Sequence, residues 1–276
     1  MLKVNKDNWK SIDINVSSLW LIGPRAGGGK HTNVYHGNFV PQIPNHLMRR
    51  YTDEGDTVLD IFTGCGTTLY ECEALNRNFI GLDINPWAID FVRQRMGESD
   101  NIKWFLHRCD ATDREAAAHA IGSSLEALQR EAVDFLIAHP PYLDIIKFSE
   151  EAGDISQISD VDVFLRKFTD AMGNGYAALK DKGYFALVAG DIYRNSEVIP
   201  LAFLMMREVQ THFACKLKGI VIKDMVGNRA KIGQEALWKY HALKSDFFLF
   251  KHEYIFVFKK ETPKQRRQRK PVASAE

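Results

Sequence analysis

Apolar, strand-like segments alternate with helix-like segments along most of this chain of 276 residues. Strands are expected near residues 57–61, 78–83, 102–106, 133–138, 183–189, 217–222 and 252–258. Helices are expected near 45–51, 66–75, 86–96, 113–131, 161–179 and 197–211. Such alternation predicts an α/β fold with a doubly wound, mostly parallel, seven-stranded sheet. The section from Ile220 to Phe258 is expected to form a closing hairpin at the edge of that sheet.

The first expected strand leads into a turn with two glycines. The segment from Thr57 to Thr68 places Gly64 and Gly66 between an apolar strand and a helix. Because glycine has no Cβ, the backbone there can approach a bound ligand closely. The spacing differs from the dinucleotide pattern G-x-G-x-x-G, since Thr67 and Thr68 follow the second glycine. The segment therefore predicts a nucleotide cradle of another kind.

Carboxylates stand at the ends of the next two expected strands. Asp83 follows the glycines by about 20 residues, a position suited to accept hydrogen bonds from both hydroxyls of a ribose. Asp110 lies near the end of the third strand, where it could meet an adenine amino group. Either acid alone could be a helix N-cap or lie in a solvated turn. The ordered series of polar strand ends favours a ligand site.

The expected strand Val133–Ala138 runs directly into His139, Pro140, Pro141 and Tyr142. Two prolines end a strand, because each fixes φ and lacks a backbone donor. A polar acceptor and an aromatic face would then lie at the carboxyl edge of the sheet, where a nucleobase could be held. Taken alone, these residues are equally compatible with a strand-ending turn that carries a surface histidine.

Together these motifs resemble the DNA amino-methyltransferases that act on adenine N6 or cytosine N4. The resemblance extends from about His36 to Lys260. The run Asp60–Thr68 is similar to the family's D-P-F-x-G-x-G-T-T motif, with Ile61 in place of the usual proline. The segment from His36 to Pro41 resembles the one that closes over the methionine part of the cofactor. The cofactor half precedes the His-Pro-Pro-Tyr half, as in members that are not circularly permuted.

The resemblance implies a Rossmann-like methyltransferase that transfers a methyl group from S-adenosylmethionine to the amino nitrogen of a flipped base. The residues that it assigns to catalysis are His139, Pro140, Pro141 and Tyr142. The residues that it assigns to the cofactor are Asn38, Phe39, Asp60, Phe62, Gly64, Gly66, Thr67, Thr68, Asp83 and Asp110.

His139 departs from the family pattern, which has Asp, Asn or Ser before Pro-Pro-Tyr. The Asp form tends to accompany adenine and the Ser form cytosine, so the target base stays open. A neutral imidazole can accept one hydrogen bond, whereas a protonated one cannot. With an ordinary pKa of about 6.5, His139 would make activity fall in mild acid.

With 45% hydrophobic residues, the chain can bury the core of one domain with insertions. We expect an N-terminal extension and loop at 1–35, a methyltransferase domain at 36–260 and a basic, disordered tail at 261–276. Residues 223–251 combine basic and aromatic side chains, which suits an insertion that faces nucleic acid. A helical cover over the sheet edge is the alternative. The nucleic-acid contacts assigned within this insertion are Arg229, Lys231, Trp238 and Lys239.

Charge and composition set further limits. The net charge is only +1, and no apolar run reaches the ~18 residues of a membrane helix. The first residues lack the apolar region of a signal peptide, so a cytoplasmic protein without a membrane partner is expected. The four cysteines form no C-x-x-C pair, and no metal site is expected.

The expected partners are double-stranded DNA and, as a candidate, a cognate restriction endonuclease, with the chain a monomer or a homodimer. The alternatives are an RNA base methyltransferase and a methyltransferase-fold protein that only binds.

Overall fold

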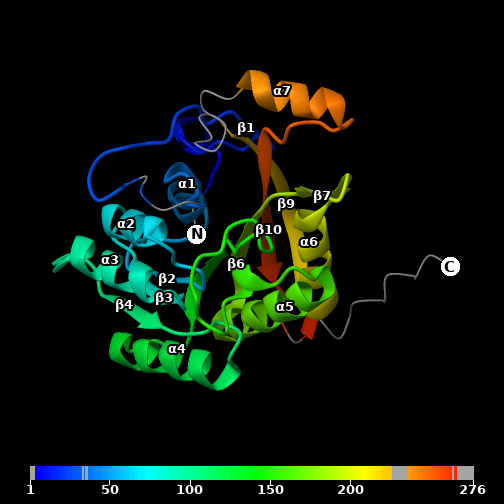
Figure 1. Cartoon of the computed structure of the whole chain (residues 1–276). Helices are drawn as coiled ribbons and strands as arrows, with labels where there is room; N and C mark the ends of the chain where they lie inside the picture. The colour runs from blue at the N-terminus through cyan, green and yellow to red at the C-terminus, as the bar shows by residue number, and fades with distance from the viewer. Residues whose placement is uncertain (1–3, 33, 35–36, 226–234, 263, 266–276) are drawn as a thin grey trace.

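The computed structural model describes residues 4–32, 34, 37–225, 235–262 and 264–265 (Figure 1). An eight-stranded sheet has the order β1-β9-β10-β6-β5-β2-β3-β4. Its strands are β1 (Leu19–Trp20), β2 (Thr57–Asp60), β3 (Asn78–Asp83), β4 (Trp104–Arg108), β5 (Val133–Ala138), β6 (Leu179–Ala189), β9 (Cys215–Asp224) and β10 (His252–Lys260). A separate hairpin consists of β7 (Ile192–Arg194) and β8 (Glu197–Ile199).

The helices are α1 (Gln42–Tyr51), α2 (Thr67–Ala74), α3 (Pro86–Met96), α4 (Arg114–Leu128), α5 (Val161–Ala178), α6 (Leu201–His212) and α7 (Glu235–Lys244). Short 3₁₀ turns cover Trp9–Ser11 and Ile155–Gln157. None of the helices in the described part of the chain is long and apolar enough to cross a membrane.

The expected mostly parallel α/β sheet is confirmed. Strands β6, β5, β2, β3 and β4 run parallel to one another, and β10 pairs antiparallel with both β6 and β9. The expected closing hairpin is therefore β9–β10. The sheet has one strand more than expected, because the two residues of β1 pair parallel with Ile222 and Lys223 of β9. A strand of two residues carries no periodicity that a sequence pattern could reveal.

One expected helix begins later than predicted. Residues 197–199 are strand β8, and α6 starts only at Leu201. The reason is Pro200, since the residue before a proline is pushed from helical into extended conformation.

Helices cover both faces of the sheet (Figure 1). On one face, α1, α2 and α3 bury a cluster that includes Leu47, Leu69 and Val92. On the other face, α4, α5 and α6 bury a second cluster that includes Phe168 and Met205. A strand covered on both faces must be apolar along its whole length, which is why all six residues of β5 are buried.

The point where the chain reverses its direction across the sheet lies between β2 and β5. The chain moves outward from β2 through β3 to β4 and then returns to β5 on the other side of β2. In open α/β sheets, ligands bind at the carboxyl ends of the strands beside such a reversal. The loops after β2, β3, β4 and β5 all lie at this edge.

Candidate functional site

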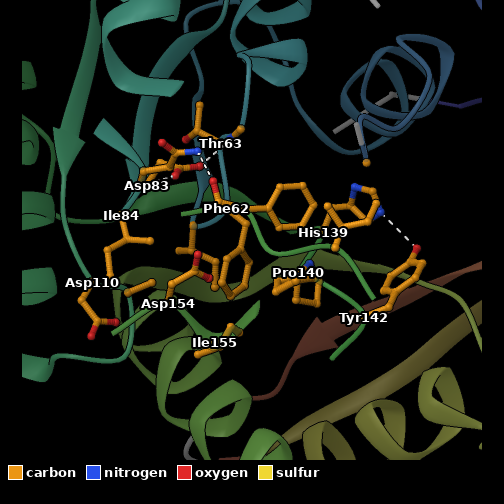
Figure 2. A pocket seen from close by; sticks show the side chains of 18 of the residues that line it. Phe62, Thr63, Asp83, Ile84, Asp110, His139, Pro140, Tyr142, Asp154 and Ile155 are labelled. Atoms are coloured by element: carbon orange, nitrogen blue, oxygen red, sulfur yellow. Dashed lines mark hydrogen bonds between the residues drawn. The ribbon is translucent and has the colours of Figure 1, made fainter. Parts of the chain in front are cut away.

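A cavity opens at the carboxyl edge of β2, β3, β4 and β5 (Figure 2). Its walls come from the loops after these strands, from residues 37–39 and from the segment that follows Tyr142. The sequence-predicted residues that line it are Asn38, Phe39, Phe62, Gly64, Thr67, Asp83, Asp110, His139, Pro140, Pro141 and Tyr142. The structure thus brings the expected cofactor half and the His-Pro-Pro-Tyr half into one hollow.

Asp83 ties the glycine turn to the end of β3. The backbone N–H of Gly64 donates to Oδ2 of Asp83 at 2.6 Å, and that of Asn85 donates to Oδ1 at 2.8 Å. Gly64 has a φ of +53°, in the left-handed region that favours glycine. Each carboxylate oxygen keeps a lone pair for a further donor in the cavity.

The environment of Asp83 disfavours its charged form. Burial raises the pKa of Asp83 to about 7. The backbone hydrogen bonds from Asn85 and Gly64 oppose this rise, and the nearby carboxyls of Asp60 and Asp154 add to it. Near neutral pH, Asp83 is therefore present in both its neutral and its charged form, and a ligand that donates hydrogen bonds would favour the charged form.

Asp60, Gly66 and Thr68 do not line the cavity. The Asp60 carboxyl is buried beneath the turn, where it accepts from Phe62 N at 3.0 Å and from Thr68 Oγ1 at 2.5 Å. Burial raises the pKa of Asp60 to about 6. A Cβ on Gly66 would lie 3.1 Å from Tyr70 and Val92, so this glycine is required by helix packing and by its φ of +84°. All three hold the turn, and their assignment as cofactor contacts stays a prediction.

The wall around Asp110 is tightly packed. A Cβ on Gly153 would lie 2.2 Å from Oδ2 of Asp110, so only glycine fits against this carboxyl. The apolar side chains of Ile84 and Ile155 line the same part of the cavity (Figure 2). A flat, apolar ring with an amino group at its edge would match these walls.

Asn38 lines the cavity and carries an unpaired donor. Its side-chain oxygen accepts from Cys65 Sγ at 2.8 Å, which ties residues 37–39 to the glycine turn. Its Nδ2 is buried and has no hydrogen-bond partner among the described residues. A buried amide that lacks a partner is costly, so an acceptor on a bound ligand would stabilise it.

His139 and Tyr142 form a hydrogen-bonded pair at the end of β5. Nε2 of His139 lies 3.0 Å from Oη of Tyr142 (Figure 2). Phe39 packs edge-on against the imidazole, with 5.0 Å between ring centroids. A Cβ on Gly190 would lie 3.0 Å from the ring of Tyr142, so the backbone of Gly190 packs closely against this ring.

The structure corrects the expected protonation of His139. The pKa of His139 is lowered from 6.5 to about 4, mainly by burial, with Glu253 opposing the fall and Lys223 adding to it. The imidazole therefore stays neutral through mild acid, and the predicted loss of activity near pH 6.5 is wrong for this group. Sequence could not show this, because the burial comes from Phe39 and from distant strands.

Sequence reasoning missed the loop after Tyr142 as a wall of the cavity. Asp154 begins the 3₁₀ turn there, with Oδ1 accepting from Ser156 N at 2.8 Å and Oδ2 from Ser149 Oγ at 2.7 Å. Asn85 donates from Nδ2 to the carbonyl of Phe148 at 2.8 Å. The signal that was available is the Asp154-x-Ser156 capping pattern after a glycine.

The expected nucleic-acid residues are only partly described. Arg229 and Lys231 lie outside the described residues. Trp238 and Lys239 lie on α7, away from the two helical layers and outside the cavity lining (Figure 1). Lys239 is exposed, whereas Trp238 is half-buried and contacts His241, with 6.3 Å between ring centroids.

Comparisons with known proteins agree with this architecture. Residues 2–94 match a family described as DNA methylase. The chain is 30% identical over 132 residues to the Type II methyltransferase M.BglI of Bacillus subtilis, which covers 45% of this chain and 36% of the relative. It is 40% identical over 106 residues to the Type II methyltransferase M.HpaI of Haemophilus parainfluenzae, covering 34% of this chain and 32% of the relative.

The crystal structure of TrmN from Thermus thermophilus superposes with a TM-score of 0.51 at 17% identity. The superposition covers 82% of this chain and 50% of TrmN, and it shows a shared fold. The fold is thus the Rossmann-like α/β architecture expected from the sequence. The likeness to the DNA methylase family is confined to residues 2–94 of the chain. Its matches span between 10% and 36% of the length of the curated relatives.

Proposed function

We propose that this protein is an S-adenosylmethionine-dependent DNA methyltransferase that modifies adenine N6 or cytosine N4. The observation that carries the proposal is the single cavity in which Asp83 and Asp110 share walls with His139 and Tyr142. The family match over residues 2–94 and the Type II methyltransferase relatives support it. Both the activity and the DNA substrate belong to this proposal.

The lining of the cavity fits S-adenosylmethionine. Asp83 would accept from the two ribose hydroxyls, because each of its oxygens has a free lone pair beside the glycine turn. Asp110 would accept from the adenine amino group, with Ile84 and Ile155 beside the ring. Nδ2 of Asn38 would donate to the carboxylate of the methionine part, which gives this buried amide the partner that it lacks.

When bound, S-adenosylmethionine supplies a methyl group on a positively charged sulfur, and this carbon is an electrophile. The chain's own residues orient the nucleophile. A base amino group has little nucleophilic character, so its lone pair must be aimed at the methyl carbon. His139, which is neutral at pH 7, and the backbone carbonyl of Pro140 would accept from the amino group and fix its direction.

Tyr142 would hold the plane of the base. An aromatic face stacks on any base, with a gain of roughly 1–3 kcal/mol per base. The target base must leave the duplex to reach the cavity, and stacking offsets part of that cost. Trp238 and Lys239, and Arg229 and Lys231 outside the described residues, are proposed contacts to the rest of the DNA. A cognate endonuclease, a monomeric or homodimeric state and a cytoplasmic location stay predictions from the sequence.

The proposal is tested with purified variants, labelled S-adenosylmethionine and double-stranded DNA. His139→Ala and Tyr142→Ala should each lose about a hundredfold or more in transfer rate, because misplacement by ~1 Å costs about that much. Cofactor affinity should stay within about twofold of the wild type. His212→Ala, an exposed histidine near the end of α6, is the matched control and should keep full activity. A wild-type rate for His139→Ala at saturating cofactor would refute the assigned role.

A further inference from the structure

Two adjacent isoleucines are exposed at the mouth of the cavity. Ile145 is 54% exposed and Ile146 is 38% exposed, and both residues line the cavity. A residue that lines a cavity and also faces solvent lies where that cavity opens. Single apolar residues on a protein surface are common and need no explanation. A pair at the entrance of a candidate site is different, because a large ligand that enters must pass these side chains.

The loop that carries the two isoleucines begins in a strained conformation. Leu143 is fully buried and has a φ of +54°, in the left-handed region that few residues other than glycine adopt. The backbone N–H of Ile145 donates to the carbonyl of Tyr142 at 3.4 Å, so the turn closes directly after the His-Pro-Pro-Tyr segment. Such strain persists only where the surrounding structure holds it, and it is concentrated at functional sites. The turn anchors the loop through Leu143 and leaves both isoleucines outside the core.

Further contacts fix the loop on both sides of the isoleucines. Before them, the Asp144 carboxylate forms an ion pair with the Arg194 guanidinium. After them, the backbone N–H of Phe148 donates to Oγ of Ser156 at 2.9 Å. A Cβ on Gly37 would lie 2.8 Å from the Phe148 ring, so this ring packs against the segment on the other side of the cavity. The isoleucines therefore extend towards solvent from a fixed support.

The place of the loop matches a requirement of the proposed reaction. His139 and Tyr142 are proposed to hold a base that has left the duplex, and its departure leaves a gap in the base stack. An apolar side chain that enters such a gap offsets part of the lost stacking, and isoleucine is among the residues that proteins insert between base steps. Isoleucine is also β-branched and stiff at χ1, so its insertion orders few torsions.

We propose that Ile145 is a wedge that enters the base stack of double-stranded DNA while the target base occupies the cavity, with Ile146 supporting it at the rim. The inference rests on the proposed function and adds a contact with the opened duplex to it. Ile145 is the more exposed of the two isoleucines, so it reaches farther from the wall. It follows Tyr142 by three residues, which places the wedge and the residue that holds the base on one loop.

The test compares one methylation site in two forms of DNA at saturating cofactor. Sequencing of DNA treated with the wild type locates the methylated base, and short duplexes are then made with a correct or a mismatched partner for this base. With the correct pair, Ile145→Ala should lower kcat/KM about ten- to a hundredfold, the order expected for the unstacking of one base step. A mismatched base leaves the stack more easily, so the loss there should shrink to about threefold or less.

Two further variants separate the wedge from a general loss of apolar surface. Ile145→Leu keeps a large apolar side chain and should retain about a third or more of the wild-type kcat/KM on the paired duplex. Ile220→Ala is the matched control on β9, where Ile220 is 37% exposed and outside the cavity lining, and it should match the wild type on both duplexes. Equal losses for Ile145→Ala on the two duplexes, or a wild-type rate on both, would overturn the inference.

Cofactor binding separates the wedge from a wall of the cofactor site. Calorimetry should give Ile145→Ala a cofactor affinity within about twofold of the wild type, because the wedge contacts DNA. A fall in cofactor affinity as large as the fall in kcat/KM would overturn the inference. Transfer by the wild type with no defect in Ile145→Ala would overturn the inference alone and leave the proposed function standing. No transfer to any DNA by the wild type would overturn the proposed function and the wedge with it.

Discussion

Asp83→Asn should change both the strength and the pH dependence of cofactor binding. The substitution keeps the size of the side chain but removes its charge and one acceptor. A hydrogen bond to a charged group contributes roughly 1.5–3 kcal/mol, so the affinity at pH 8 should fall about ten- to a hundredfold. Asp110→Asn is the matched control, since it also weakens binding but leaves the titration of Asp83 in place.

The sign of the pH dependence follows from the raised pKa of Asp83, about 7 in the free protein. Ribose hydroxyls donate to the carboxylate and favour its charged form, so binding should release a proton. At pH 6 only about a tenth of the molecules carry a charged Asp83, and the wild-type affinity should be about tenfold weaker than at pH 8. Asp83→Asn should show no such slope, and the gap between the two proteins should narrow as the pH falls.

Isothermal titration calorimetry between pH 6 and pH 8.5 measures both effects. Repeating the titration at pH 7 in buffers with different ionisation enthalpies should show release of about half a proton by the wild type and none by Asp83→Asn. Asp110→Asn should release protons as the wild type does. A wild-type affinity that is constant from pH 6 to pH 8 would refute the assignment of Asp83 to the ribose.

Three further predictions concern other walls and surfaces. Gly153→Ala places a Cβ where it would lie 2.2 Å from Oδ2 of Asp110, so calorimetry should show a cofactor affinity of about one tenth of the wild-type value or lower. Unchanged affinity would remove Asp110 from the adenine site. With saturating cofactor and DNA, the transfer rate should stay level from pH 7 to pH 5.5, because burial lowers the pKa of His139 to about 4, and a fall centred near pH 6.5 would contradict this. Lys239→Ala should lower the log–log salt slope of DNA binding by about one unit, whereas an unchanged slope would return α7 to the role of a structural cover.

Much of the fold could be predicted because its signals are local. Each signal lies within one short segment: the apolar run of β5, the two glycines after β2, the acid at the end of β3 and the acid after β4. Parallel strands then bring their carboxyl ends to one edge, which places Asp83, Asp110 and His139 around the same cavity. The position of these residues thus follows from order and periodicity alone.

The missed features depend on contacts between distant segments. Lys223 and Glu253 are separated by 30 residues and meet only through the register of β9 and β10. The neutral state of His139 at pH 6.5 results from burial that no neighbouring residue in the sequence reveals. Asp60 has the same residue type as Asp83 but lies beneath the turn, because it pairs with Gly81, two residues before Asp83 in β3.

The most direct test of the central claim is mass spectrometry of nucleosides from unmethylated double-stranded DNA. The DNA is incubated with the purified protein and S-adenosylmethionine that carries an isotopically labelled methyl group, and RNA is treated in parallel. We expect labelled N6-methyladenine or N4-methylcytosine in the DNA, at least a hundredfold less with His139→Ala, and no label in the RNA. Label confined to the RNA, or none in either nucleic acid while the protein binds the cofactor, would contradict the proposed function.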